Sequence, residues 1–199
     1  MSAEISPRPY RMRRRAEQQD QTRRRITESA VELHGTLGPA RTSMSAVAAR
    51  AGVRRSTLYR HFPDEAALFE ACNAHWSAAN RPPELAAWAA VGDPDERLRV
   101  ALGELHAYYR QTEAMLDNLF RDESIVAPVA EHFSAFRAYL AEAQETLMAG
   151  RRLRGAAAGR TRGALGHAVA FSAWKSLVRE QGMGDADAVE LLRALVAAS

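Results

Sequence analysis

The sequence has 199 residues, of which 47% are hydrophobic, enough for a packed core in one large or two small domains. Its single cysteine, Cys72, excludes an intrachain disulfide and a cysteine metal cluster and is typical of a reducing compartment. There is no apolar run of about 18 residues and no apolar segment within the arginine-rich start, so we expect no membrane span, no secretory signal and a cytoplasmic location.

The net charge of +3 is unevenly divided along the chain. Residues 1–81 carry 14 arginines against 8 acidic residues, whereas residues 82–199 carry 13 basic against 16 acidic residues. A positive surface attracts DNA through counterion release, and an acidic surface is repelled from phosphates. The charge distribution therefore indicates a nucleic-acid partner for the first part of the chain.

Residues 1–20 contain five arginines and two prolines but no apolar periodicity. This composition predicts a basic flexible arm. Such an arm is either a solvated tail or an element that follows phosphates or enters the minor groove when a neighbouring domain docks on DNA. The composition leaves both alternatives open.

The first helix predicted from periodicity runs from Arg23 to Leu37 and is stopped by Gly38-Pro39. Its apolar stripe consists of Ile26, Ala30, Leu33 and Leu37. The three arginines at its start oppose the helix dipole, which weakly favours a phosphate partner over a merely solvated face.

Residues 43–62 predict two short helices joined by a turn at Gly52, which can adopt the left-handed conformation of a helix end. Thr42 or Ser43 supplies a hydroxyl cap, and Leu58 and Phe62 face inward on the second helix. The candidate DNA-binding residues are the possible caps and the outward or sideways side chains: Thr42, Ser43, Arg54, Arg55, Ser56, Thr57, Tyr59, Arg60 and His61. The set on the second helix contains no carboxylate, as is typical of a helix-turn-helix that inserts a helix into DNA.

The same segment resembles the TetR family of bacterial transcriptional regulators. The resemblance rests on Gly52-Val53 and on the string TLYRHFP that begins at Thr57, and it extends over about residues 26–68. It implies a DNA-binding head of three helices in which Tyr59 and His61 contact phosphates.

The resemblance also implies that Arg55, Ser56 and Thr57 lie near base edges. Two positions depart from the family's pattern. Arg54 stands where the family usually has Ser, so the second helix loses its N-cap hydroxyl and gains a positive charge. Glu65 stands where Lys or Arg is frequent in the family.

The segment from Asp64 to Asn80 predicts a further helix, with Asp64 as its N-cap. We therefore expect a DNA-binding domain at residues 21–81 and an effector-binding and dimerisation domain at residues 82–199. The second domain shows helical periodicity throughout, with a short helix at Ala114–Phe120 and a flexible connection at residues 150–160. The predicted fold class is all-α, an N-terminal three-helix helix-turn-helix head plus a C-terminal helical domain.

The last two predicted helices, Thr161–Gln181 and Asp185–Ala198, are apolar on more than one face. A helix with two apolar faces buries one inside its own subunit and the other against a partner. The family resemblance implies a homodimer built on these helices. The candidate interface residues are Leu165, Val169, Ser172, Val189, Leu192, Leu195 and Val196.

The resemblance further implies a small-molecule effector bound in the second domain. The candidate ligand-binding residues are large or polar groups on inward-facing stripes: His106, Tyr109, Phe120, Phe133, Phe136, His167, Phe171 and Trp174. For each of them taken singly an ordinary core position is the favoured interpretation, and the pocket as a whole is better supported than any one of its members.

We find no sequence motif for catalysis, and we expect neither a cofactor nor a metal. The six histidines form no metal-binding pair, and there is no nucleophile elbow. The function predicted is a sequence-specific regulator, a ligand-responsive repressor that binds a palindromic double-stranded DNA operator as a dimer. The alternatives are an architectural DNA-binding protein without an effector and a helical small-molecule-binding protein or enzyme.

Overall fold

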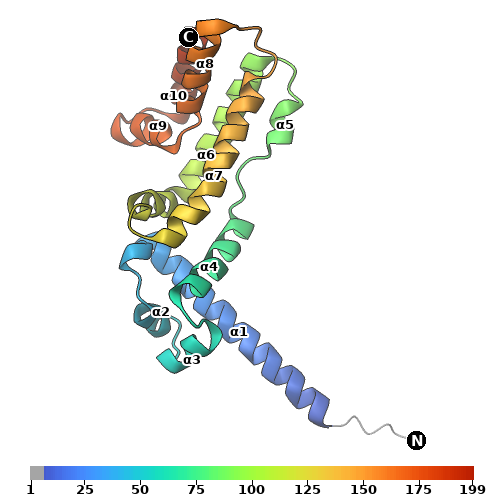
Figure 1. Cartoon of the computed structure of the whole chain (residues 1–199), viewed down its shortest axis with the longest axis vertical. Coiled ribbons are helices and arrows are strands. Elements are labelled where there is room, and N and C mark those ends of the chain that lie inside the picture. The colour runs from blue at the N-terminus through green and yellow to red at the C-terminus, as the bar shows by residue number, and fades with distance from the viewer. Residues whose placement is uncertain (1–6) are drawn as a thin grey trace, which may run out of the picture. The chain divides into compact units, whose positions relative to one another are not determined.

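The computed structural model describes residues 7–199, apart from the side chains of residues 7–9, 11 and 132. These residues form helices and connecting turns without a strand (Figure 1), so the all-α fold class is confirmed. The helices are α1 (Pro7–Thr36), η1 (Pro39–Arg41), α2 (Met44–Arg50), α3 (Arg55–His61), α4 (Glu65–Ala79), α5 (Leu85–Ala89), α6 (Pro94–Asp122), α7 (Ala127–Met148), α8 (Gly155–Ala168), α9 (Phe171–Lys175), η2 (Ser176–Glu180) and α10 (Asp185–Ala197).

The chain divides into two compact units. Unit 1 comprises residues 1–79 and 117–129, and unit 2 comprises residues 80–116 and 130–199. Helices α1 to α4 belong to unit 1 together with the last turns of α6. Helix α6 therefore supplies residues to both units.

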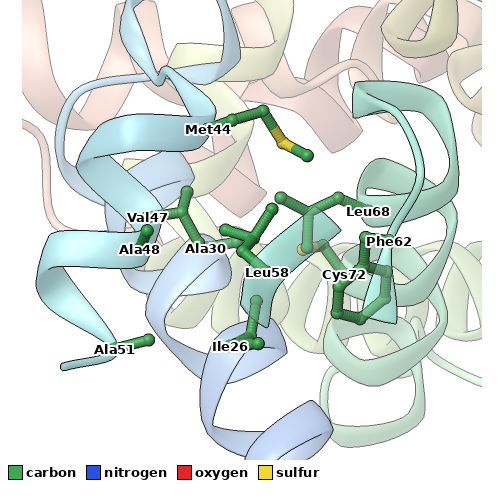
Figure 2. Packing of buried hydrophobic residues seen from close by; sticks show 10 residues of the cluster. All are labelled: Ile26, Ala30, Met44, Val47, Ala48, Ala51, Leu58, Phe62, Leu68 and Cys72. Carbon is green, nitrogen blue, oxygen red and sulfur yellow. The ribbon is translucent and has the colours of Figure 1, made fainter. Parts of the chain in front are cut away.

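Unit 1 is built on a core contributed by α1, α2, α3 and α4 (Figure 2). Ile26 of α1, Leu58 of α3 and Phe62 at the end of α3 are fully buried. The cluster consists of Ile26, Ala30, Met44, Val47, Ala48, Ala51, Leu58, Phe62, Leu68 and Cys72. Because apolar burial contributes about 25 cal/mol per Å², this cluster is the main force that holds the short helices α2 and α3 in place.

The turn between α2 and α3 has the geometry predicted from the sequence. The Ser43 side chain accepts a hydrogen bond from the Ala46 amide at 3.2 Å and caps α2. Gly52 adopts φ 63°, a conformation that L side chains rarely reach. The Val53 amide then donates to the Ala48 carbonyl at 3.0 Å, which closes the end of α2.

The end of α6 is joined to the end of α1 by side-chain hydrogen bonds within unit 1. The Asn118 amide group donates to the His34 and Gly35 carbonyls at 3.0 and 2.8 Å, and Arg121 donates to the Leu37 carbonyl at 2.9 Å. Asp122 accepts from the Ala40 amide of η1 at 3.0 Å. These bonds satisfy carbonyls that the end of a helix leaves without partners. We call Asn118, Arg121 and Asp122 the α6 joint.

Gly38 is required where the α6 joint approaches the chain. Its φ is 94°, and a Cβ there would collide with the Arg121 guanidinium and the Asp122 carboxylate. Burial would raise the pKa of Asp122, but hydrogen bonds from Arg121 and the Ala40 amide outweigh burial and hold it below its ordinary value. Asp122 is therefore an ionised, buried anchor and not a solvated loop charge.

Helix α1 is longer than the sequence pattern indicated. From Pro7 onward the expected flexible arm is part of α1, and residues 1–6 lie outside the described residues. Pro7 and Pro9 fall in the first turn, where a missing amide proton costs little. The Arg, Gln, Glu and Ala residues that follow are good helix formers. Apolar periodicity is absent because this part of α1 is exposed, not because it is irregular.

Several helix boundaries in unit 2 also differ from expectation. The short helix at Ala114–Phe120 is the end of α6, and residues 155–160 of the expected connection form the start of α8. The single helix expected at Thr161–Gln181 is divided into α8, α9 and the π-helical segment η2. The division occurs where the Tyr109 hydroxyl donates to the Val169 carbonyl in place of a helical amide.

Unit 2 contains a buried arginine that joins α6 to the end of α7. Arg97 is 6% exposed, and its guanidinium donates to the carbonyls of Val91, Thr146 and Ala149 at 2.7 to 3.1 Å. A planar guanidinium with five donors suits three carbonyls that point at one site. The residue therefore closes the C-terminal end of α7 and the turn before α6.

We predict that Arg97→Lys lowers the free energy of unfolding by about 2 to 4 kcal/mol. An ammonium group cannot reach all three carbonyls, and each buried acceptor left without a donor costs about 1 to 3 kcal/mol. Urea unfolding monitored by circular dichroism measures this loss. Arg99→Lys is the matched control, because Arg99 is half exposed and pairs with Glu96 on the same helix. Equal stability of the two variants would contradict the role assigned to Arg97.

Candidate nucleic-acid interface and ligand site

The second helix of the predicted helix-turn-helix, α3, presents a polar face from a rigid base. Leu58 and Phe62 are 0% exposed, so the rotation of α3 about its axis is fixed by the core. The exposed residues are Arg54, Arg55, Ser56, Tyr59 and Arg60, and Thr57 and His61 are half-buried at the edge. The structure thus brings all seven predicted residues of this segment onto or beside one surface that carries no carboxylate.

Arg55 and Tyr59 form one structural pair on that surface. The Arg55 guanidinium donates to the Tyr59 hydroxyl at 3.1 Å and lies 5.4 Å from the centre of its ring. The pair lies one helical turn apart, so each side chain restricts the other. A phosphate or base edge that binds one of these two side chains therefore also lies close to the other.

The imidazole of His61 is affected by its partial burial and by two neighbouring arginines. Burial, followed by the nearby Arg60 and Arg23 charges, lowers its pKa below the ordinary value. Its Nε2 is buried and makes no hydrogen bond within the described part of the chain. The backbone carbonyl of His61 accepts from Arg23 at 2.7 Å, and that guanidinium lies 4.1 Å from the centre of the Phe62 ring. The sequence did not identify Arg23 as the residue that ties α1 to the end of α3.

The residues at the start of each helix have different roles. Thr42 is half-buried and donates to the Gly38 carbonyl at 2.8 Å, so its hydroxyl serves the turn before α2, while Ser43 caps α2. Arg54 occupies the N-cap position of α3 and makes no side-chain cap. The loss of a capping hydroxyl at Arg54 is therefore confirmed, and its guanidinium remains exposed on the α3 surface.

Residues 26–72, which contain this whole arrangement, match the family model described as bacterial regulatory proteins, tetR family. The match covers the DNA-binding segment, so this part of the chain is similar to the TetR family of transcriptional regulators. No curated protein matches the sequence. The family match confirms the resemblance seen in the TLYRHFP string.

Solved structures share the fold over nearly the whole chain. A TetR-like transcriptional regulator from Rhodococcus sp. RHA1 has a TM-score of 0.60 and 22% identity and covers 88% of this chain and 93% of that chain. NalD, the secondary repressor of the MexAB-OprM multidrug efflux pump in Pseudomonas aeruginosa, has a TM-score of 0.61, 21% identity and coverage of 92% and 96%. AibR in complex with isovaleryl coenzyme A and operator DNA has a TM-score of 0.62, 16% identity and coverage of 87% and 97%.

Most of the predicted ligand residues lie in one aromatic cluster of unit 2. Tyr109 contacts Phe171 and Trp174, with ring centres 5.4 and 5.9 Å apart. Through Tyr108 the cluster continues to Phe136, and Phe136 lies 6.0 Å from Phe133. Tyr108 was missed because it lies next to Tyr109 and therefore about 100° around the helix from the predicted stripe.

Apart from His106, two predicted ligand residues lie outside this cluster. Phe120 is 41% exposed and belongs to unit 1, and His167 is exposed on α8. Both residues lie on helices, as their spacing in the sequence predicted. Spacing alone does not show which face of a helix is covered by a neighbouring helix. Two surface hollows, of about 100 Å³ in unit 1 and about 240 Å³ beside α10, are not lined by any of the predicted ligand residues.

His106 is a buried polar side chain connected to the aromatic cluster through Asp185, which contacts both His106 and Trp174. It is 1% exposed, and neither ring nitrogen has a hydrogen-bond partner among the described residues. Its Nδ1 lies 3.9 Å from Asp185, whose carboxylate accepts from Arg110 and, at 3.3 Å, from Trp174. Burial, more than the opposing attraction of Asp185, lowers the pKa of His106 to about 4.

The predicted dimer residues are mostly part of the core of a single subunit. Leu165, Val169, Val189, Leu192 and Val196 are each at most 7% exposed within one chain. Ser172 is exposed, and Leu195 is 46% exposed. The outward apolar residues of α10 are Leu191 and Leu195, and the dimer interface stays a prediction. Helix α10 is apolar on two faces, and the periodicity did not show which face belonged to the core.

We predict that the protein loses stability as the pH falls from about 6.5 toward 4, in part because of His106. Its pKa is lower in the folded chain than in the unfolded one, so only the unfolded chain binds the proton in this window. His106→Leu should reduce the slope of unfolding free energy against pH by up to about 1.4 kcal/mol per unit. Urea unfolding at several pH values measures the slope.

His75→Leu is the control for that measurement, since it removes an exposed histidine from α4. An unchanged slope in His106→Leu would show that the folded protein protonates His106 freely, contrary to its burial.

Proposed function

We propose that this protein is a TetR-family, ligand-responsive repressor that binds a palindromic DNA operator as a homodimer. The observation that carries the proposal is the carboxylate-free face of α3, held by Leu58 and Phe62 on the core of unit 1. Arginines can bind guanine edges or phosphates, and Ser, Thr and Tyr hydroxyls can donate to phosphate oxygens. In this proposal α3 enters the major groove, and the protein acts in the cytoplasm without catalysing a reaction.

The structural relatives support the same assignment. The AibR structure contains operator DNA and isovaleryl coenzyme A, and NalD is described as a repressor. We extend to this chain the use of a DNA operator and of a small-molecule effector. Among the described residues no helix is long and apolar enough to cross a bilayer.

We place the effector site at the aromatic cluster, with His106 as the polar point. Apolar pockets with a few polar groups are the usual form of small-molecule sites. A neutral, buried imidazole supplies one donor and one acceptor to a ligand, so the chemistry favoured is an apolar or aromatic molecule with one hydrogen-bonding group.

A signal from the effector can reach the DNA-binding surface along two helices. The sequence suggested the helix at Asp64 to Asn80, which is α4 and packs on α1. The α6 joint offers a second connection, because Asn118, Arg121 and Asp122 hold the end of α1 and η1. An effector shifts the equilibrium only if it binds one arrangement of these helices better than another.

A DNA-binding architectural protein without an effector, and a small-molecule-binding protein or enzyme for which DNA is incidental, are the competing functions. The first would show weak sequence discrimination with a steep dependence on salt. The second would keep its activity when the α3 surface is altered.

We predict that Arg55→Ala reduces discrimination at particular base pairs by about 1 to 3 kcal/mol, whereas Tyr59→Phe weakens binding to all sequences alike. Because Arg55 donates to the Tyr59 hydroxyl, the double variant should lose less than the sum of the single losses. Fluorescence anisotropy with a duplex selected from a random pool, and with its single-base variants, measures both effects. Arg152→Ala, an exposed arginine of unit 2, is the control. Binding by all variants as by the parent would reject α3 as the recognition helix.

We also predict that Leu195→Glu yields monomers while leaving the fold intact. Leu195 is on the outward apolar face of α10, so a carboxylate there would be buried without a partner in a dimer but solvated in a monomer. Light scattering measures the mass, and circular dichroism checks the helices. Leu153→Glu, at a comparably exposed leucine between α7 and α8, is the control. A Leu195→Glu dimer would place the interface elsewhere.

A further inference from the structure

The first half of α1 extends beyond the core that it helps to build. Ile26 is the first buried residue of the helix, and each described side chain before it is exposed except Thr22, which is half-buried. Residues 7–25 span about 28 Å at 1.5 Å per residue. We call residues 7–25 the α1 extension. Figure 1 shows it running past α3, the helix of the DNA-binding surface in the same unit.

The α1 extension is strongly basic. Residues 7–25 contain eight arginines and two acidic residues, Glu17 and Asp20. The first turn contains no acidic residue, so the positive charges oppose the helix dipole. Arg13 pairs with Glu17 at 3.2 Å, but Arg15 makes no ion pair within the described residues. A helix of this length with no packing partner is only marginally stable in water. A polyanion beside it would remove both costs.

The helical register shows that Arg15 continues the face of α1 that packs on the core. Ile26 and Ala30 are buried on this face, and Arg15 lies eleven residues before Ile26, which is close to three full turns. Thr22 occupies the intervening position. On this face apolar side chains therefore give way to polar side chains and to Arg15 where α1 leaves the protein core, as expected if its neighbour changes from protein to a polyanion.

The direction of the α1 extension relative to α3 is fixed by contacts within unit 1. Arg23 donates to the His61 carbonyl and lies over the Phe62 ring, both at the end of α3. Arg50 of α2 forms a two-pronged ion pair with Glu32 of α1. A continuous helix held at these points cannot swing freely, so a duplex bound by α3 meets the extension at a defined place.

We propose that the α1 extension binds the phosphate backbone of the operator outside the base pairs read by α3, so that flanking DNA of any sequence contributes to affinity. This inference rests on the proposed DNA-binding function. Helix α3 has seven residues and covers about 10 Å, whereas the extension spans about 28 Å, roughly eight base pairs at 3.4 Å each. Arginine contacts to phosphates carry no sequence information, so the extension adds affinity without changing the operator sequence.

The test compares a selected operator with long flanks of mixed sequence and the same operator trimmed to its palindrome. We expect the parent protein to bind the long duplex at least about tenfold more tightly, and Arg14→Gln/Arg15→Gln to lose a large part of this preference. Removing one arginine–phosphate interaction lowers the slope of log affinity against log salt by about 0.9, so the double variant in a dimer should reduce the slope on the long duplex by about 2 to 4. Gln retains the helix propensity of Arg, and circular dichroism checks this.

The matched control is Arg152→Gln/Arg154→Gln, which removes the same charge from exposed positions of unit 2 and should bind like the parent. The converse variant, Gln19→Arg, adds charge on the core-side face of the extension and should steepen the salt slope on the long duplex alone. The inference is overturned if the parent ignores the flanks, or if the control double variant is weakened as much as Arg14→Gln/Arg15→Gln. In either case, selection of a preferred operator by the parent protein would still support the proposed function. The proposed function itself fails only if the parent protein selects no duplex from the random pool.

Discussion

The interaction on which the rest of unit 1 depends is the burial of Leu58 and Phe62 against α1. Helix α3 has only two turns, too few to be stable alone, so its form and its orientation come from this burial. The exposed arginines and hydroxyls act as one surface only because those two side chains fix the helix axis and its rotation. Arg23 strengthens the same contact through the His61 carbonyl and the Phe62 ring. A change in the core would therefore alter DNA binding without touching an exposed residue.

The α6 joint places a second constraint on this surface. Asn118, Arg121 and Asp122 satisfy the last carbonyls of α1 and the first amide of η1, so the segment that leads into α2 is held by residues about 80 positions later in the sequence. Because Gly38 cannot carry a side chain there, the contact admits little adjustment. Buried polar contacts of this kind are costly when only partly satisfied. A displaced α6 would therefore move the end of α1 or break the bonds.

The parts that could be predicted from sequence are those decided by neighbours in the chain. Ser43 as a cap, Gly52 as a turn and Leu58 with Phe62 as the inner face follow from local chemistry and from helical spacing. The parts that could not be predicted depend on what lies against a face. Leu192 and Leu195 are both apolar residues of α10, yet only Leu195 is exposed. The Arg97 and Asp122 contacts join residues distant in sequence, and no periodic pattern marks them.

In the proposed complex, different parts of α1 would contribute to the affinity for DNA and to its sequence specificity. In unit 1 the apolar part of α1 supports the helix that would read base edges, and its basic part carries charges suited to phosphates. The two parts are one rigid element, so an effector that tilted α1 would move phosphate contacts and α3 together. Phosphate contacts weaken with salt, whereas contacts to base edges depend on geometry. An allosteric change acting through α1 would therefore reduce affinity for all DNA and discrimination between sequences at the same time.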